Sequence, residues 1–171
     1  MTAEEREQER EQEREQERER GGGGQLSAAA RRERQQELAT ALGERAVSES
    51  ERLILESGGA VALYVAVEPD GGFRLTWWQT ATAPAGHPRW REAAAALTRP
   101  GEAIYTSALG GGFLVELERR AGSVDEARRL AGETAPVERV AALAAAFPEA
   151  LAQLTPEPVP GYLLPPEPEE P

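Results

Sequence analysis

Two pairs of strand-like segments around a turn constrain the fold of this chain more than any other feature: the second segment of each pair alternates between apolar and polar residues, and 60–67 is apolar on both faces, as in a central strand. "AVALYVAV" (60–67) and "FRLTWWQT" (73–80) flank "EPDGG", while "EAIYTSAL" (102–109) and "FLVELER" (113–119) flank three glycines at 110–112. A period of two is typical of β-strands, and Pro, Asp and Gly favour tight turns. The sequence therefore predicts two β-hairpins, with a hairpin turn rather than a phosphate-binding loop at the three glycines.

The segment 26–57 has the composition of a helical region that precedes the first hairpin. Ser27 is placed to cap its first turn, and the apolar stripe Leu38, Leu42 and Ala46 follows an i+4 spacing. A second capping box lies within "VSESERLILESGG". The segment is therefore expected to form either one long helix or two helices in succession.

Three further helices are expected after the first hairpin. One begins at Pro88 and ends before "RPG", because proline favours the first turn of a helix. The capping box "SVDE" (123–126) begins the second, and Pro136 begins a third that ends near Leu154. The predicted fold class is α+β: a two-layer sandwich in which helices on one face cover a four-stranded, mainly antiparallel sheet.

The net charge of −11 is concentrated at the two ends of the chain. Residues 1–24 and 155–171 each carry −4, whereas the long middle region carries only −3. The first end is a coiled-coil-like Glu/Arg/Gln repeat without an apolar face, followed by four glycines, and the second is acidic and rich in proline. We expect 1–24 to be disordered or marginally helical, 25–57 helical, 58–154 an α+β domain, and 155–171 disordered.

Composition also excludes several classes of function. The chain has no cysteine, one histidine (His87) and two aspartates (Asp70 and Asp125), so neither a catalytic triad nor a His/Cys zinc site can be assembled. We therefore predict no catalytic residue, cofactor or metal. The acidic balance indicates no nucleic-acid partner, and no apolar run reaches the roughly 20 residues of a membrane span.

The origin and location of the protein are inferred from the same composition. The absence of lysine and asparagine, with arginine as the basic residue, indicates a GC-rich bacterial genome. The polar N-terminus lacks the apolar region of a secretory signal, which leads us to expect a cytoplasmic location.

"WWQTATAPAGHPRW" (77–90) contains every tryptophan of the chain and its histidine. Trp77 aligns with Phe73 and Leu75 and is predicted to lie in the core, whereas Trp78 lies on the opposite strand face. Tryptophan and arginine dominate the energetics of protein interfaces. The alternative is that all three indoles belong to the core or its rim, with His87 exposed in a loop. The predicted partner-binding residues are Trp78, His87, Arg89, Trp90 and Arg74, with Tyr162, Leu163 and Leu164 in the tail as a second docking segment.

The leading hypothesis is a small non-enzymatic adaptor that binds a protein partner. Its hairpin–helix–hairpin layout is similar in outline to small bacterial secretion-chaperone-like and toxin-immunity domains, and a regulatory subunit is equally compatible. The alternative is a small-molecule sensor or minor enzyme with a pocket between the long helix and the sheet, lined by Arg74, Arg89 and Glu116. A third possibility is a homodimer formed by the N-terminal helix.

Overall fold

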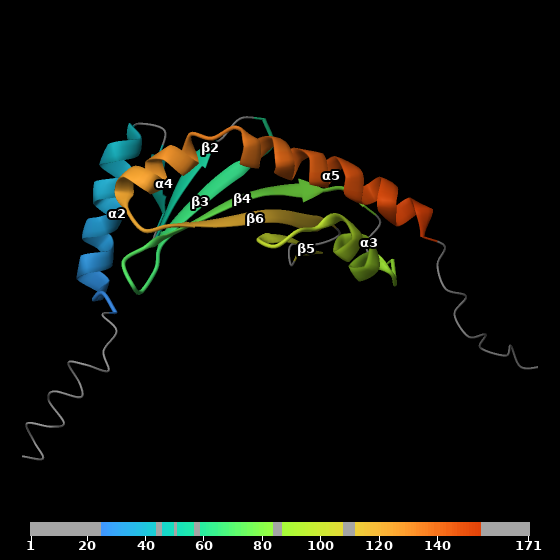
Figure 1. Cartoon of the computed structure of the whole chain (residues 1–171), viewed down its shortest axis with the longest axis horizontal. Helices are drawn as coiled ribbons and strands as arrows, with labels where there is room; N and C mark the ends of the chain where they lie inside the picture. The colour runs from blue at the N-terminus through green and yellow to red at the C-terminus, as the bar shows by residue number, and fades with distance from the viewer. Residues whose placement is uncertain are drawn as a thin grey trace, which may run out of the picture. The chain divides into compact units, whose positions relative to one another are not determined.

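The computed structural model of the chain describes residues 25–43, 46–49, 51–56, 59–83, 87–107 and 112–154. These residues form four helices and six strands. The strands make one antiparallel sheet in the order β1-β2-β3-β4-β6-β5 (Figure 1). The α+β class and the antiparallel pairing are thus confirmed, but the predicted number of strands is wrong, since the sheet has six rather than four.

The two additional strands lie where the sequence predicts helix. β1 (Ala46–Glu49) and β2 (Arg52–Glu56) form an antiparallel hairpin, in which Ala46 pairs with Leu55. Leu53 and Leu55 are buried. This burial has the period of a strand, and the tertiary packing of these leucines outweighs the helix-start pattern in "SESE". The helical prediction is therefore wrong for Ala46–Glu49 and Arg52–Glu56.

The first part of the same segment is helical as predicted. α2 (Ala28–Leu42) begins after Ser27, whose hydroxyl oxygen accepts a hydrogen bond of 3.2 Å from the Ala30 N–H. The helix ends at Gly43, which adopts a φ of 74°. Leu38 and Leu42 are buried as expected, whereas Ala46, the third member of the predicted stripe, belongs to β1.

Both predicted hairpins are present. β3 (Ala62–Val67) leads to β4 (Phe73–Ala81) through a turn closed by the Glu68 N–H, which donates to the Gly72 carbonyl oxygen at 2.8 Å. β5 (Glu102–Thr106) pairs antiparallel with β6 (Phe113–Ala121), and the turn predicted at the three glycines lies largely outside the described residues, which omit 108–111. The alternating faces are correct: the buried side chains are Phe73, Leu75 and Trp77 in β4 and Phe113, Val115 and Leu117 in β6.

The remaining helices follow their predicted boundaries closely. α3 (Trp90–Leu97) begins two residues after Pro88, and α4 (Val124–Ala131) uses its capping box, with Ser123 accepting from the Glu126 N–H. α5 (Ala135–Gln153) is one helix that includes Pro148. None of the described helices is long and apolar enough to span a lipid bilayer.

The chain forms two compact units, each assembled from separate stretches. Unit 1 contains the described residues of 25–55, 64–75 and 119–132, and within it α2 packs beside α4. Unit 2 contains those of 56–63, 76–118 and 133–154, and within it α3 packs beside α5 and β5. β3, β4 and β6 each contribute residues to both units.

Candidate functional site

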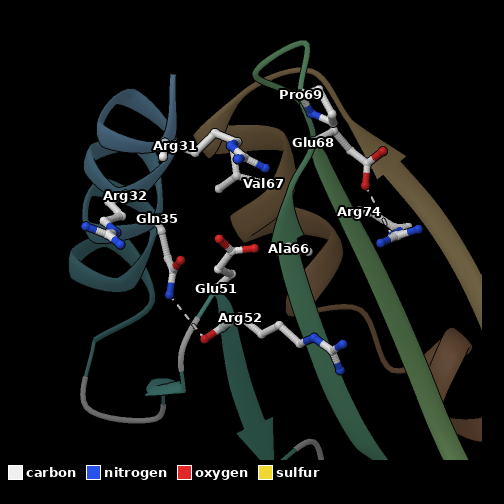
Figure 2. Close-up of a pocket in the computed structure, with 11 residues that line it drawn as sticks. Arg31, Arg32, Gln35, Glu51, Arg52, Ala66, Val67, Glu68, Pro69 and Arg74 are labelled. Atoms are coloured by element: carbon white, nitrogen blue, oxygen red, sulfur yellow. Dashed lines mark hydrogen bonds and ion pairs between the residues drawn. The ribbon is translucent and has the colours of Figure 1, made fainter. Parts of the chain in front are cut away.

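Unit 1 contains a pocket of about 310 Å³ between α2 and the strands β2, β3 and β4 (Figure 2). This volume lies at the lower end of the range of roughly 300–1,000 Å³ that is usual for small-molecule sites. Four arginines and two glutamates line the pocket, which gives the lining a formal charge of +2. The charged residues are Arg31 and Arg32 on α2, Glu51 and Arg52 at the β1–β2 hairpin, and Glu68 and Arg74 at the β3–β4 hairpin.

Contacts with the β3–β4 turn fix the position of α2 above the sheet. The Leu26 N–H donates to the Pro69 carbonyl oxygen at 2.7 Å. The guanidinium of Arg34 donates to the Gly71 carbonyl oxygen at 3.1 and 3.3 Å, and it also lies 5.3 Å from the centre of the Phe73 ring. A side chain at position 71 would approach Leu26 to 3.1 Å, so glycine allows this close docking.

A buried glutamine attaches the same helix to the β1–β2 hairpin. The Gln35 side-chain nitrogen donates to the Ser48 hydroxyl oxygen at 2.9 Å and to the Arg52 carbonyl oxygen at 3.2 Å. Sequence reasoning missed this residue. The sequence does contain an indication of its role. Position 35 lies on the same helical face as Leu38 and Leu42, and a polar side chain buried beside leucines requires hydrogen-bond partners.

Arg31 and Glu51 reach into the pocket from opposite walls. Figure 2 shows the Arg31 side chain extending from α2 towards β3 and the Glu51 carboxylate pointing into the same space from the β1–β2 turn. Arg32, on the same helix, also belongs to the lining. Arg74 forms an ion pair of 3.2 Å with Glu68. The centre of the pocket is therefore flanked by one cation and one anion.

The Arg31 Nε–H is shielded from solvent and has no acceptor among the residues that the structure describes. Within that part of the chain, no ion pair joins Arg31 to Glu51 either. A buried donor without an acceptor costs about 1–3 kcal/mol, and such groups are uncommon in folded proteins. Arg31 therefore lines the pocket with a guanidinium whose shielded Nε–H is left unsatisfied by the described residues.

The aromatic residues predicted to bind a partner lie in unit 2. Trp77 is fully buried, which confirms its predicted place in the core, and Trp78 and Trp90 are half-buried. The Trp90 ring lies 5.6 Å from that of Phe113, which in turn packs 4.8 Å from that of Phe147 in α5. Trp90 thus anchors the start of α3 to the interior of unit 2.

His87 and Arg89 have partners within the same unit. The Arg89 N–H donates to His87 Nδ1 at 3.2 Å, so the ring proton is on Nε2, which donates to the Leu154 carbonyl oxygen at 3.2 Å. The Arg89 guanidinium forms a bidentate pair with Glu92, at 2.7 and 2.8 Å. The expectation that His87 is exposed is wrong: the ring is half-buried because it connects this loop to the end of α5.

The other residues predicted to bind a partner are not among the described residues of unit 2, which include Trp78, His87, Arg89 and Trp90. Arg74 belongs to unit 1, and Tyr162, Leu163 and Leu164 lie outside the described residues. Of the lining predicted for the alternative pocket, only Arg74 lines the observed one, since Arg89 and Glu116 belong to unit 2.

Glu116 has a structural partner in the neighbouring strand. Its carboxylate accepts a hydrogen bond from the Tyr105 hydroxyl. Burial and the adjacent carboxylate raise the pKa of Tyr105 above its ordinary value. The pair links β5 to β6 and gives Glu116 a role in the sheet.

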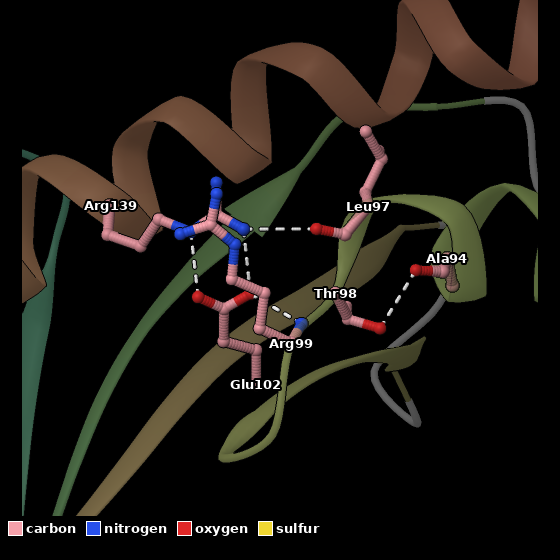
Figure 3. A network of polar contacts seen from close by, with 6 residues as sticks. All are labelled: Ala94, Leu97, Thr98, Arg99, Glu102 and Arg139. Carbon is pink, nitrogen blue, oxygen red and sulfur yellow. Dashed lines mark hydrogen bonds and ion pairs between the residues drawn. The ribbon is translucent and has the colours of Figure 1, made fainter.

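A second polar network fixes the elements of unit 2 (Figure 3). Arg139 on α5 donates to both carboxylate oxygens of Glu102, at 2.7 and 2.8 Å, and to the Leu97 carbonyl oxygen at 3.0 Å. The Arg99 N–H donates to the same carboxylate at 2.9 Å. The hydrogen bonds from Arg139 lower the pKa of Glu102, although burial acts in the opposite direction. No local sequence pattern could identify this pair, whose members are far apart in the chain.

No group of three His, Asp or Glu side chains in the described part of the chain is arranged to hold a metal ion. Comparison with known protein families, with curated proteins and with solved structures yields no match to this chain. The function must therefore be inferred from the charged pocket and the surfaces of the molecule itself.

Proposed function

We propose that this protein binds a small anionic molecule in the pocket of unit 1 and acts as a sensor or carrier of that molecule. The observation that carries the proposal is the shielded Nε–H of Arg31, which has no acceptor among the described residues. An anionic group of a ligand would accept from this guanidinium, and such charge-assisted hydrogen bonds are stronger than neutral ones. Ligand binding would therefore satisfy a donor that folding leaves unused.

The charge distribution supports an anionic ligand. The lining carries a formal +2, whereas the whole chain carries −11. A local positive region in an acidic protein concentrates small anions at the pocket, while the field of the whole molecule disfavours large polyanions. Nucleic acid is therefore a poor candidate for this site.

Thermal unfolding with three probes tests the proposal: inorganic phosphate, 4-methylpentanoate and L-leucine. A ligand that binds only the folded state stabilises it by about 2.7 kcal/mol at 100 times its dissociation constant. We expect at least one probe to raise the Tm of the wild-type chain, with a much smaller rise for Arg31→Gln. Arg128→Gln is the matched control, since it removes the same charge from an exposed position of unit 1 outside the pocket lining.

Two outcomes would contradict the proposal. One is that none of the three probes raises the Tm of the wild-type chain at millimolar concentration. The other is that Arg31→Gln responds to a stabilising probe as strongly as Arg128→Gln does, since binding would then not depend on the Arg31 guanidinium.

A protein partner at the surface around Trp78 and Trp90 is the second candidate function. The half-buried state of both indoles favours it, as does the Arg91 guanidinium, which lies 4.9 Å from the centre of the Trp90 ring. Affinity capture from host lysate with the full chain, with Trp78→Ala and with a chain lacking 155–171 tests this candidate. A stoichiometric protein lost only with Trp78→Ala would support it, and loss only on truncation would instead indicate the tail as the docking segment.

A further inference from the structure

We propose that the ligand of the unit 1 pocket is a compact zwitterion with a short aliphatic group, of the kind found in an aliphatic amino acid. This inference rests on the proposed function, because it concerns the same pocket and the same arginine. It goes further by assigning a role to Glu51 and to the apolar wall of the pocket.

Arg31 and Glu51 are opposite charges that face one space without pairing with each other (Figure 2). A ligand carboxylate would complete the hydrogen bonding of the Arg31 guanidinium, and a ligand ammonium would pair with Glu51. A molecule with both groups bridges the two side chains. A ligand with only an anionic group would leave the Glu51 carboxylate as a like charge beside it.

Three other arginines around the pocket have described contacts elsewhere. Arg74 pairs with Glu68 at 3.2 Å, and the Arg52 guanidinium lies 5.9 Å from the centre of the Tyr64 ring. Arg34, one turn along α2 from Arg31, is hydrogen-bonded to Gly71. Arg31 and Glu51 are thus the two charged side chains that point into the pocket from opposite walls, and Arg32 is a further cation of the lining.

The remaining lining indicates the size and the polarity of the ligand. Four small apolar residues complete the wall, and the volume of about 310 Å³ leaves room for a short aliphatic chain against them. The Gln35 side-chain nitrogen is already bound to Ser48 and Arg52, so it adds no free donor at the base. The apolar residues are Ala28, Ala66, Val67 and Pro69.

Isothermal titration calorimetry of the full chain tests this assignment with three matched probes. L-leucine carries both charges, 4-methylpentanoate lacks the ammonium, and 3-methylbutylamine lacks the carboxylate. We expect L-leucine to bind about tenfold or more tightly than either analogue, the factor typical of one charge-assisted hydrogen bond. Glu51→Gln should abolish the preference for L-leucine over 4-methylpentanoate, Arg31→Gln should weaken the binding of both, and Arg128→Gln, outside the lining, should weaken neither.

The results separate this inference from the proposed function. Equal, Arg31-dependent affinity for L-leucine and 4-methylpentanoate would overturn the zwitterion assignment while leaving an anion-binding pocket. Arg31-dependent binding of inorganic phosphate in preference to L-leucine would do the same. The absence of binding by all of these probes would contradict both.

Discussion

At the residue scale, two arginines on α2 show how a side chain used for folding differs from one available for a ligand. Arg34 donates to Gly71 and lies over Phe73, whereas the Arg31 Nε–H is shielded and has no acceptor in the described structure. Both occur in the run "RRERQQ", in which nothing distinguishes them before the fold is known. In contrast, the burial of Trp77 could be predicted from the sequence alone. Successive side chains of a strand point to opposite faces, so the alternating pattern assigns Trp77 to the buried face.

Arg31→Gln and Arg34→Gln are expected to affect stability differently. Arg34→Gln should lower the free energy of unfolding by about 1–2 kcal/mol, because it removes charged hydrogen bonds. Arg31→Gln should not lower it and should raise it by up to about 1–3 kcal/mol, since it removes a buried donor that has no described acceptor. Urea denaturation measures both values, and equal losses would show that Arg31 has a structural role.

At the element scale, the sequence predicts helices and hairpins correctly where capping or turn residues determine the secondary structure. The prediction fails where burial of side chains against other elements determines it. Ser27 and the "SVDE" box begin helices as predicted. The "SESE" pattern does not, because Leu53 and Leu55 are buried in β2. The hydrogen bonds between Gln35 and the β1–β2 hairpin form only when both α2 and the hairpin are folded, so a local sequence pattern does not predict them.

Gln35→Ala should loosen the β1–β2 hairpin from α2. The variant loses two hydrogen bonds from a buried side chain, which is expected to cost about 1–2 kcal/mol of unfolding free energy. Hydrogen exchange should become faster at the amides of β1 and β2. Gln36→Ala, at an exposed neighbouring position, is the control, and equal protection in both variants would contradict the anchoring role of Gln35.

The Glu102–Arg139 pair should make unit 2 sensitive to acid. The pKa of Glu102 is lowered in the folded state, so its contribution to stability is present above the ordinary glutamate pKa of 4.5 and is lost as the pH falls towards the lowered value. Glu102→Gln should cost about 1.5–3 kcal/mol at pH 7. The difference in unfolding free energy between wild type and variant should narrow below pH 4.5. A difference that is constant from pH 7 to pH 3 would contradict this assignment.

At the scale of the whole molecule, the arrangement of the strands was beyond prediction from local patterns. β4 pairs with β6 although α3 and β5 separate them in the chain, and the added hairpin extends the sheet beyond β3. Each long strand is shared by the two units. The pocket combines α2 with three strands, so its lining could not be assembled without the topology, although a pocket between the long helix and the sheet was foreseen.

We expect the two units to unfold in one transition, because β3, β4 and β6 contribute to both. All three tryptophans lie in unit 2, so tryptophan emission reports on that unit, whereas far-UV circular dichroism reports on both. The two urea transitions should coincide. Gln35→Ala, a change in unit 1, should shift the tryptophan transition as well, and an unshifted midpoint would show that the units unfold independently.

The most direct test of the central claim is to observe the Arg31 Nε–H itself. Its signal in the ¹H–¹⁵N NMR spectrum of arginine side chains can be assigned by its absence in Arg31→Gln. We predict that titration with L-leucine or 4-methylpentanoate shifts this signal, while the signal of Arg128, an exposed arginine outside the pocket lining, stays in place. If the Arg31 signal does not respond to either molecule at concentrations up to tens of millimolar, a small carboxylate is not held by Arg31 and the account of the pocket is wrong.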